Sequence, residues 1–152
     1  MPEARFEPKI VAFFCTWCTY TAADLTGISR LTYAPNVRTI RLMCSGRLDP
    51  QFVLEAFHRG ADGVLVGGCH PGDCHYQEGN YKAARRIELL HAVLREMGIE
   101  DERLRLEWIS ASEGDKVQRV CNEMTEQLRR LGPLQLARPA RSRVQVAAAE
   151  AK

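Results

Sequence analysis

Short apolar runs alternate four times with segments of helical character along this chain, and this alternation constrains the fold more than any other feature. Four runs have the length and apolar content of buried strands: 10–14, 37–43, 63–66 and 104–109. Each is followed by a helical pattern, over about 21–33, 49–60, 83–98 and 112–131. Because crossover helices join parallel strands, the sequence predicts a single doubly wound α/β domain. We expect a mostly parallel four-stranded sheet with helices on both faces, of the flavodoxin-like or Rossmann-like type.

The expected helix boundaries rest on capping residues. Thr21 to Asp24 matches a capping box, Asp49 before Pro50 is a typical N-cap, and Ser112 is expected to begin the fourth helix. Three acidic residues are interpreted as caps or early-turn charges: Asp24, Asp49 and Glu113. Arg85–Arg86 is interpreted as part of an exposed helix face.

The third and fourth helices carry regular apolar stripes. Their members are spaced by three and four residues: Ala83, Ile87, Leu90, Leu94 and Met97 in the third helix, and Val117, Val120, Met124, Leu128 and Leu131 in the fourth. The pattern ends at Gly132-Pro133. We therefore expect a folded domain over residues 1–132 and a flexible tail or partner-binding arm over 133–152, which contains Arg138, Arg141 and Arg143.

Composition excludes several functional classes. The net charge of +2 gives no basic field that would favour nucleic acid. The N-terminus MPEARFEPKI lacks the apolar region of a secretory signal, and no apolar run is long enough to span a membrane. We expect a cytoplasmic protein, in which stable structural disulfides are improbable. Its six cysteines therefore indicate metal or redox chemistry.

Five of the six cysteines follow the first three predicted strands. Cys15 and Cys18 follow the first, Cys44 the second, and Cys69 and Cys74 the third. The carboxyl edge of a parallel sheet is where ligands bind, and three adjacent strand ends span only about 10 Å. We therefore expect these five thiols to converge. Cys121 lies on or beside the apolar stripe of the fourth helix and is interpreted as a buried, inert thiol.

The uneven spacing of these cysteines is compatible with a [2Fe–2S] cluster held by four of the five. Three alternatives remain open: a structural zinc ion, a redox dithiol formed by Cys15 and Cys18, and a Rieske-like centre that includes His70 or His75. The histidines would otherwise donate hydrogen bonds to sulfur or to nearby backbone. No phosphate-binding glycine motif and no nucleophile triad is recognisable.

Glycine and proline surround the cysteines. Gly67 and Gly68 are expected to let backbone amides approach sulfur closely. Residues 71–73, Pro-Gly-Asp, are expected to form a tight turn that folds Cys74 back toward Cys69, and Ser45-Gly46 offers a similar turn after Cys44. N–H groups directed at the sulfurs would raise the reduction potential of a cluster.

Four segments together resemble a known family. FFCTWCTYTAADLTGISR, IRLMCSGRLDP, GADGVLVGGCHPGDCHYQEGNY and ERLRLEWISASEG occur in the order seen in the delta subunit of methyl-viologen-reducing (F420-non-reducing) hydrogenase. The resemblance runs from about residue 10 to 132 and includes all five strand-end cysteines. It implies a small iron–sulfur protein with one [2Fe–2S] cluster. It further implies that the protein connects a hydrogenase or formate dehydrogenase to the flavin-containing A subunit of heterodisulfide reductase, which bifurcates electrons.

The expected function is therefore that of an electron-transfer subunit that turns over no substrate alone. Trp17, Tyr20 and Tyr76 lie beside the cysteines in the sequence. They are expected either to form part of a docking face or to shield the cluster.

Overall fold

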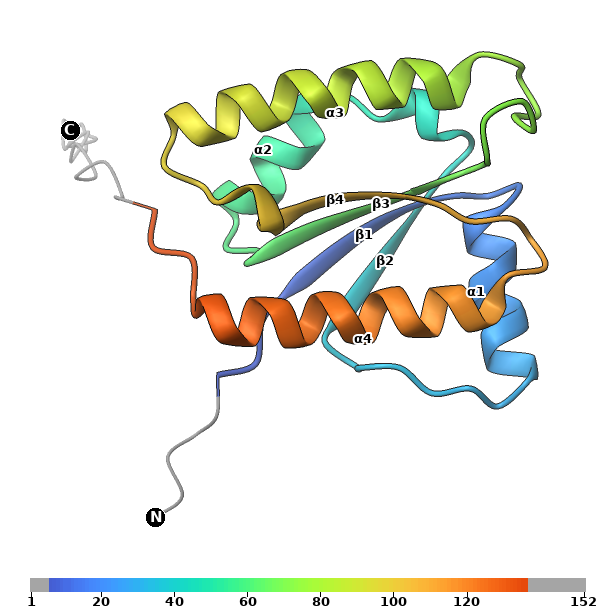
Figure 1. The fold of residues 1–152 in the computed structure, drawn as a ribbon, viewed down its shortest axis with the longest axis horizontal. Coiled ribbons are helices and arrows are strands. Elements are labelled where there is room, and N and C mark those ends of the chain that lie inside the picture. Colours follow the sequence, from blue (N-terminus) through green and yellow to red (C-terminus); the bar gives the residue numbers. More distant parts are fainter. Residues whose placement is uncertain (1–5, 137–152) are drawn as a thin grey trace, which may run out of the picture.

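The computed structural model describes residues 6–136 as four strands and four α-helices, with two short 3-10 helices (Figure 1). The strands are β1 (Ile10–Cys15), β2 (Val37–Leu42), β3 (Gly63–Gly68) and β4 (Leu104–Trp108). The α-helices are α1 (Thr19–Ile28), α2 (Pro50–His58), α3 (Gly79–Glu96) and α4 (Gly114–Leu131). The 3-10 helices are η1 (Ser45–Arg47) and η2 (Asp101–Arg103). The predicted alternation of strand and helix is confirmed.

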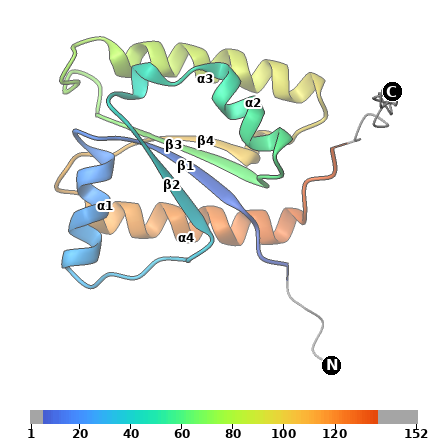
Figure 2. The ribbon, with the colours of Figure 1, turned by 180° about the vertical axis from the view of Figure 1, so that it is seen from behind.

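All four strands are parallel and lie in the order β2-β1-β3-β4. Helices α2 and α3 cover one face of the sheet, and α1 and α4 cover the other (Figures 1 and 2). This is the flavodoxin-like strand order, with four strands in the described part of the chain. The predicted doubly wound α/β fold is confirmed. No helix within residues 6–136 is both long enough and apolar enough to span a membrane.

Each face of the sheet has its own hydrophobic core. The first joins Phe13 and Val66 to apolar side chains of α2 and α3, including Val53, Phe57 and Leu90. The second joins Phe14 and Leu65 to Ala22 of α1 and to the predicted stripe of α4, whose members Val117, Val120, Met124 and Leu128 are buried. The outer ends of the two predicted stripes, Met97 and Leu131, are exposed.

Some predicted helix boundaries are wrong. α1 begins at Thr19, so Thr21 and Asp24 lie inside the helix, and the Thr21 hydroxyl donates to the carbonyl of Thr16. The first helix also ends at Ile28 rather than near Tyr33. α4 has Glu113 at its N-cap instead of Ser112, although no side chain caps its first turn.

The predicted cap at Asp49 is confirmed, because its carboxylate accepts a hydrogen bond from the N–H of Gln51. Gly60 and Gly98 follow α2 and α3 with positive φ angles, as expected for residues that end a helix.

Residues 133–136 continue along the folded domain. Leu134 and Leu136 pack against the first core, and the N–H of Leu134 donates to Asp62. Arg138, Arg141 and Arg143 lie outside the described residues.

Candidate metal centre

The five strand-end cysteines are buried at the carboxyl edge of the sheet. Cys15 is the last residue of β1, Cys18 precedes α1, Cys69 directly follows β3, Cys44 precedes η1, and Cys74 lies in the loop before α3. β1 lies between β2 and β3, and the chain crosses to opposite faces of the sheet after β1 and after β2. The carboxyl ends of β1 and β3 therefore form the switch point at which doubly wound sheets bind ligands.

The structure gathers the five thiols into two neighbouring sets. The first is formed by Cys15, Cys18 and Cys69, whose sulfur atoms all lie within 4.8 Å of one another. Within it, the sulfurs of Cys15 and Cys69 are 3.8 Å apart. The second set is formed by Cys44 and Cys74, whose sulfurs are also 3.8 Å apart. The expected turn at residues 71–73 is present, with Asp73 N–H bonded to the carbonyl of His70, but it carries Cys74 to Cys44 instead of Cys69.

One thiol of the first set favours the thiolate form. The thiol of Cys18 donates toward the sulfur of Cys15 and lowers the pKa of Cys15 to about 5. The same interaction, with burial, raises the pKa of Cys18, and burial raises the pKa of Cys69 to about 11. These shifts favour negative charge on Cys15, which a bound metal ion would compensate.

The second set lies against the first turn of α3. Burial raises the pKa of the Cys74 thiol, but backbone N–H groups of Asn80, Tyr76 and Gly79, together with the Cys44 thiol, lower it below its ordinary value. Burial raises the pKa of Cys44, and the N–H of Gly46 at 3.3 Å partly offsets this effect. The free amides at the start of α3 therefore favour negative charge on Cys74.

Gly79 is the glycine that makes room for sulfur. A Cβ atom at this position would lie 2.2 Å from the Sγ of Cys44 and 3.2 Å from the Sγ of Cys74. Gly67 and Gly68 were predicted to let backbone amides approach sulfur, but the space beside each of them is filled by other side chains. A Cβ on Gly67 would meet the side chain of Thr19, and one on Gly68 would meet Ser45 and Trp108. These two glycines allow β3 to pack closely on its neighbours.

Two polar side chains of α3 hold the cysteine loops in place. The amide of Asn80, which is buried, donates to the carbonyls of Cys69 and His70 at 3.0 and 2.9 Å. The guanidinium of Arg86 donates to the carbonyls of Gly46 and Leu48, in the segment that follows Cys44. Arg85 is exposed, as predicted, but Arg86 is half-buried and fixes the η1 segment.

Both histidines of the motif have partners other than sulfur. The Nε2 atom of His70 lies 2.7 Å from the carboxylate of Glu113. Glu113 also accepts from the N–H of Ser110, and these two contacts lower the pKa of Glu113 to about 2, the Ser110 amide having the larger effect. Glu113 was interpreted from the sequence as a cap or an early-turn charge. It does occupy the N-cap position of α4, but its carboxylate ties the loop after β4 to the loop after β3 instead of capping the helix. The ring of His75 stacks on Trp17 with centroids 3.8 Å apart.

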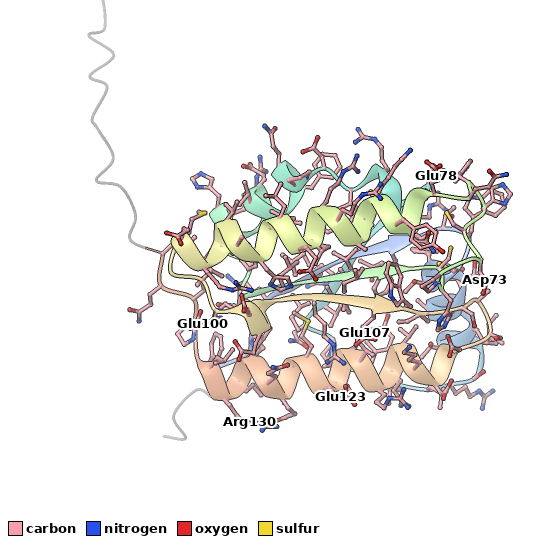
Figure 3. All side chains as sticks on the ribbon, turned by 45° about the horizontal axis from the view of Figure 1, so that its top comes forward. Asp73, Glu78, Glu100, Glu107, Glu123 and Arg130 are labelled. Carbon is pink, nitrogen blue, oxygen red and sulfur yellow. The ribbon has the colours of Figure 1, made fainter. Side chains whose placement is uncertain are left out.

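The cysteine loops reach the surface at an aromatic group formed by Trp17, His75 and Tyr76. Trp17 and Tyr76 are 47% and 52% exposed, and the indole N–H of Trp17 donates to the Tyr76 hydroxyl at 3.4 Å. Tyr20 differs, because it packs against the second core beneath the guanidinium of Arg41. A cavity of about 250 Å³ opens beside this group over Cys18 and Cys69. Figure 3 shows Asp73, which lines this cavity, and Glu78 at the same end of the molecule, opposite Glu100.

Cys121 lies apart from the other thiols, within the second core. It is fully buried, and burial raises its pKa to about 12. We expect Cys121→Ala to leave any metal bound at the sheet edge unchanged and to lower the free energy of unfolding by about 1 kcal/mol, the cost of a small cavity. Iron analysis and urea denaturation of the variant measure the two effects. Loss of metal from this variant would place the site elsewhere.

The donor set fits a thiolate-bound metal. A tetrahedral ion with metal–sulfur bonds of about 2.3 Å holds two thiolates about 3.8 Å apart. Both the Cys15–Cys69 pair and the Cys44–Cys74 pair have this separation. Fold and site together define a class of protein: a parallel α/β domain that carries a buried cysteine centre at its switch point.

Comparison with known proteins identifies the family within this class. Residues 10–132 match the family of the methyl-viologen-reducing hydrogenase delta subunit, and the chain belongs to this family. The vhc iron-sulfur subunit of the F420-non-reducing hydrogenase of Methanococcus voltae is 56% identical over 132 residues, which cover 87% of this chain and 92% of the relative. The iron-sulfur subunit of the F420-non-reducing hydrogenase of Archaeoglobus profundus is 57% identical over 134 residues, which cover 88% and 98%. The family resemblance predicted from the sequence is confirmed.

A third relative has a different architecture. It is the A subunit of the ferredoxin/F(420)H(2)-dependent CoB-CoM heterodisulfide reductase of Methanosarcina acetivorans, which is 51% identical over 127 residues. These residues cover 84% of this chain but only 16% of the relative. The same domain therefore occurs as a part of a much longer polypeptide.

Sequence reasoning located the cysteines but missed the residues that support them. Gly79 and Asn80 carry a weak signal: a glycine directly after the cysteine motif, followed by an amide side chain at the start of a helix. Glu113 and Arg86 carry none, because their partners lie 43 and 40 residues away in the sequence.

Proposed function

We propose that this protein is an electron-transfer subunit that carries one [2Fe–2S] cluster on four of the five strand-end cysteines. The observation that carries the proposal is the arrangement of two thiol pairs, Cys15–Cys69 and Cys44–Cys74, each with sulfurs 3.8 Å apart. A [2Fe–2S] cluster needs two protein ligands on each of two iron atoms. A single structural zinc ion would need four ligands around one centre.

Cys18 is the fifth thiol in this proposal. Its sulfur lies 3.6 Å from the hydroxyl of Thr19, whereas Cys15 and Cys69 form the matched pair. Cys18 also lies against the sulfur of Cys15, where its S–H group can donate to a ligand thiolate. We therefore assign it a supporting role beside the ligands, with Cys15, Cys44, Cys69 and Cys74 as the four ligands.

The bound cluster would supply one-electron transfer, and the protein would control its surroundings. Burial of the five thiols excludes water from the ligands. The N–H groups of Gly46 and of the first turn of α3 point toward the sulfurs of the Cys44–Cys74 pair. Hydrogen bonds to cluster sulfur stabilise the reduced form, so these amides would raise the reduction potential.

The relatives indicate the partners. The close relatives are named as iron-sulfur components of F420-non-reducing hydrogenases, and two Methanosarcina relatives are heterodisulfide reductase A subunits that contain this domain within their own chain. Domains fused in one organism commonly associate as separate chains in another. We infer that this protein relays electrons between a hydrogenase or formate dehydrogenase module and a flavin-containing heterodisulfide reductase A-like partner, in the cytoplasm.

The exposed aromatic group supports docking near the cluster. Trp17 and Tyr76 flank the cysteines and remain about half exposed, although they contact each other and His75. Aromatic residues are enriched at protein interfaces. A partner that covers this group would lie directly above the cysteine loops, close enough for electron tunnelling.

Metal analysis tests the proposal. We expect protein purified without exposure to oxygen to contain about two iron and about two acid-labile sulfide per chain. Dithionite should produce one rhombic S = 1/2 electron paramagnetic resonance signal. Stoichiometric zinc without sulfide would support the zinc-stabilised adaptor instead. A colourless, metal-free protein that reduces disulfides through Cys15 and Cys18 would support the dithiol alternative.

A further inference from the structure

A second surface feature lies away from the cavity above Cys18 and Cys69. An apolar cleft of about 830 Å³ runs between β2 and α2. Its apolar lining comes from β1, β2 and α2: Val11, Phe13, Ile40, Leu42, Phe52 and Ala56. The cleft exists because α2 leaves part of this face of β2 uncovered, and Ile40 is 46% exposed as a result.

The cleft is bordered by an open sheet edge. Within residues 6–136, β2 pairs only with β1, so its outer N–H and C=O groups have no strand partner. The register places Arg38, Ile40 and Leu42 opposite Val11, Phe13 and Cys15. An edge strand beside an apolar cleft is the arrangement that binds extended peptides: the backbone supplies hydrogen bonds, and alternate side chains enter the cleft.

The charges around the cleft favour an acidic occupant. Both acidic side chains in its lining are already paired, Glu7 with Arg129 and Glu55 with Arg59. Lys9 and Arg38 also line the cleft, and within residues 6–136 neither forms an ion pair. The uncompensated charge along the cleft is therefore positive.

We propose that the β2 edge and its cleft bind an extended segment of a partner protein, with apolar side chains at alternate positions and carboxylates beside them. The occupant is a polypeptide, because a small apolar ligand would leave the free backbone groups of β2 unused. The inference rests on the proposed relay function, which needs separate contacts for an electron donor and an electron acceptor. β2 continues through the exposed Met43 into Cys44, so a segment bound along β2 would lead toward the cysteine centre.

Hydrogen exchange of the complete chain tests this surface. The probes are a purified heterodisulfide reductase A-like flavoprotein and, separately, purified hydrogenase subunits. We expect one of them to slow amide exchange in residues 37–42 by at least tenfold relative to the free chain. Ile40→Glu should weaken binding of that partner at least tenfold. The matched control is Ile28→Glu, which places the same charge at an apolar side chain on α1 that is 79% exposed and outside the cleft.

Unchanged amide exchange in β2 with both partners, or an equal loss of partner binding in Ile40→Glu and Ile28→Glu, would overturn the proposal. So would faster amide exchange in β2 of the free chain after truncation at Leu136. A dimer of the free chain that Ile40→Glu dissociates would also overturn it. The last two results would assign the cleft to a segment of this chain or to a second copy.

Iron and sulfide counts distinguish failure of the proposed relay function from failure of the β2 docking surface. A chain without a cluster that still binds a partner through β2 would overturn the relay function and support the docking surface.

Discussion

Gly79→Ala is expected to remove most of the iron from the protein. The added methyl group would lie 2.2 Å from the sulfur of Cys44 and 3.2 Å from that of Cys74, well inside van der Waals contact. Either the thiol pair or the first turn of α3 must then move, and the amides directed at Cys74 move with that turn. We expect iron and sulfide per chain to fall by roughly tenfold or more, since ligand geometry sets metal affinity.

Alanine favours a helix more than glycine does, so the substitution alone should stabilise α3. A loss of iron would therefore report the clash with sulfur and not a weakened helix. Replacing glycine by alanine inside a helix stabilises it by about 0.5–1 kcal/mol. Gly27, in the last turn of α1, has open space where a Cβ would lie, and it provides the matched control. Gly27→Ala should retain the full cluster signal and unfold at slightly higher urea concentration. If Gly79→Ala also retains its iron, the Cys44–Cys74 pair is not part of the cluster site.

Serine substitution of the cysteines should separate ligands from the supporting thiol. Cys74→Ser and Cys44→Ser are each expected to destroy or strongly shift the cluster signal, because each would remove one of the two thiolates that we propose as ligands of one iron. Cys69→Ser should have the same effect, because Cys69 would hold the cluster together with Cys15. We expect iron content to fall by more than about tenfold, or the paramagnetic resonance spectrum to change its g values where an oxygen ligand replaces sulfur.

Cys18→Ser should behave differently from these three. Serine keeps a hydroxyl donor near Cys15 and a contact with Thr19, so the iron and sulfide counts should remain near those of the parent chain. A small change in reduction potential is expected, because the donor beside a ligand sulfur changes. Complete loss of iron in Cys18→Ser, with retention in Cys15→Ser, would exchange the roles that we assign to these two residues.

The sequence predicted the fold well because strand and helix alternate with strong periodic signals. The buried strands β1 and β3 are nearly continuous apolar runs, and the stripe of α4 is regular from Val117 to Leu128. Helix starts were less predictable. Thr21 resembles an N-cap, but the chain already turns into α1 after Cys18, where no side chain caps the helix.

The convergence of the five cysteines was predictable from the sequence, but their grouping into two sets was not. The strand ends fix which cysteines meet, because all parallel strands point their carboxyl ends to one edge. The loops decide which thiols pair, and the loop after β3 carries Cys74 across to Cys44. That path depends on contacts between distant segments, such as the bond from Arg86 to Gly46, which leave no local pattern in the sequence.

The separation of the two hydrophobic cores from the cysteines has a consequence for how this protein is made. Each core is complete without the thiols of the sheet edge, and Cys15, Cys18 and Cys69 form a small cluster of their own. Neither core therefore depends on a bound metal, unlike small zinc domains whose folding depends on the ion. The paired thiols come from positions 54 and 30 residues apart, so no short peptide could assemble the site. Cluster insertion would then be the last step of maturation. The cluster would enter the folded domain at the sheet edge, where the cysteine loops reach the surface.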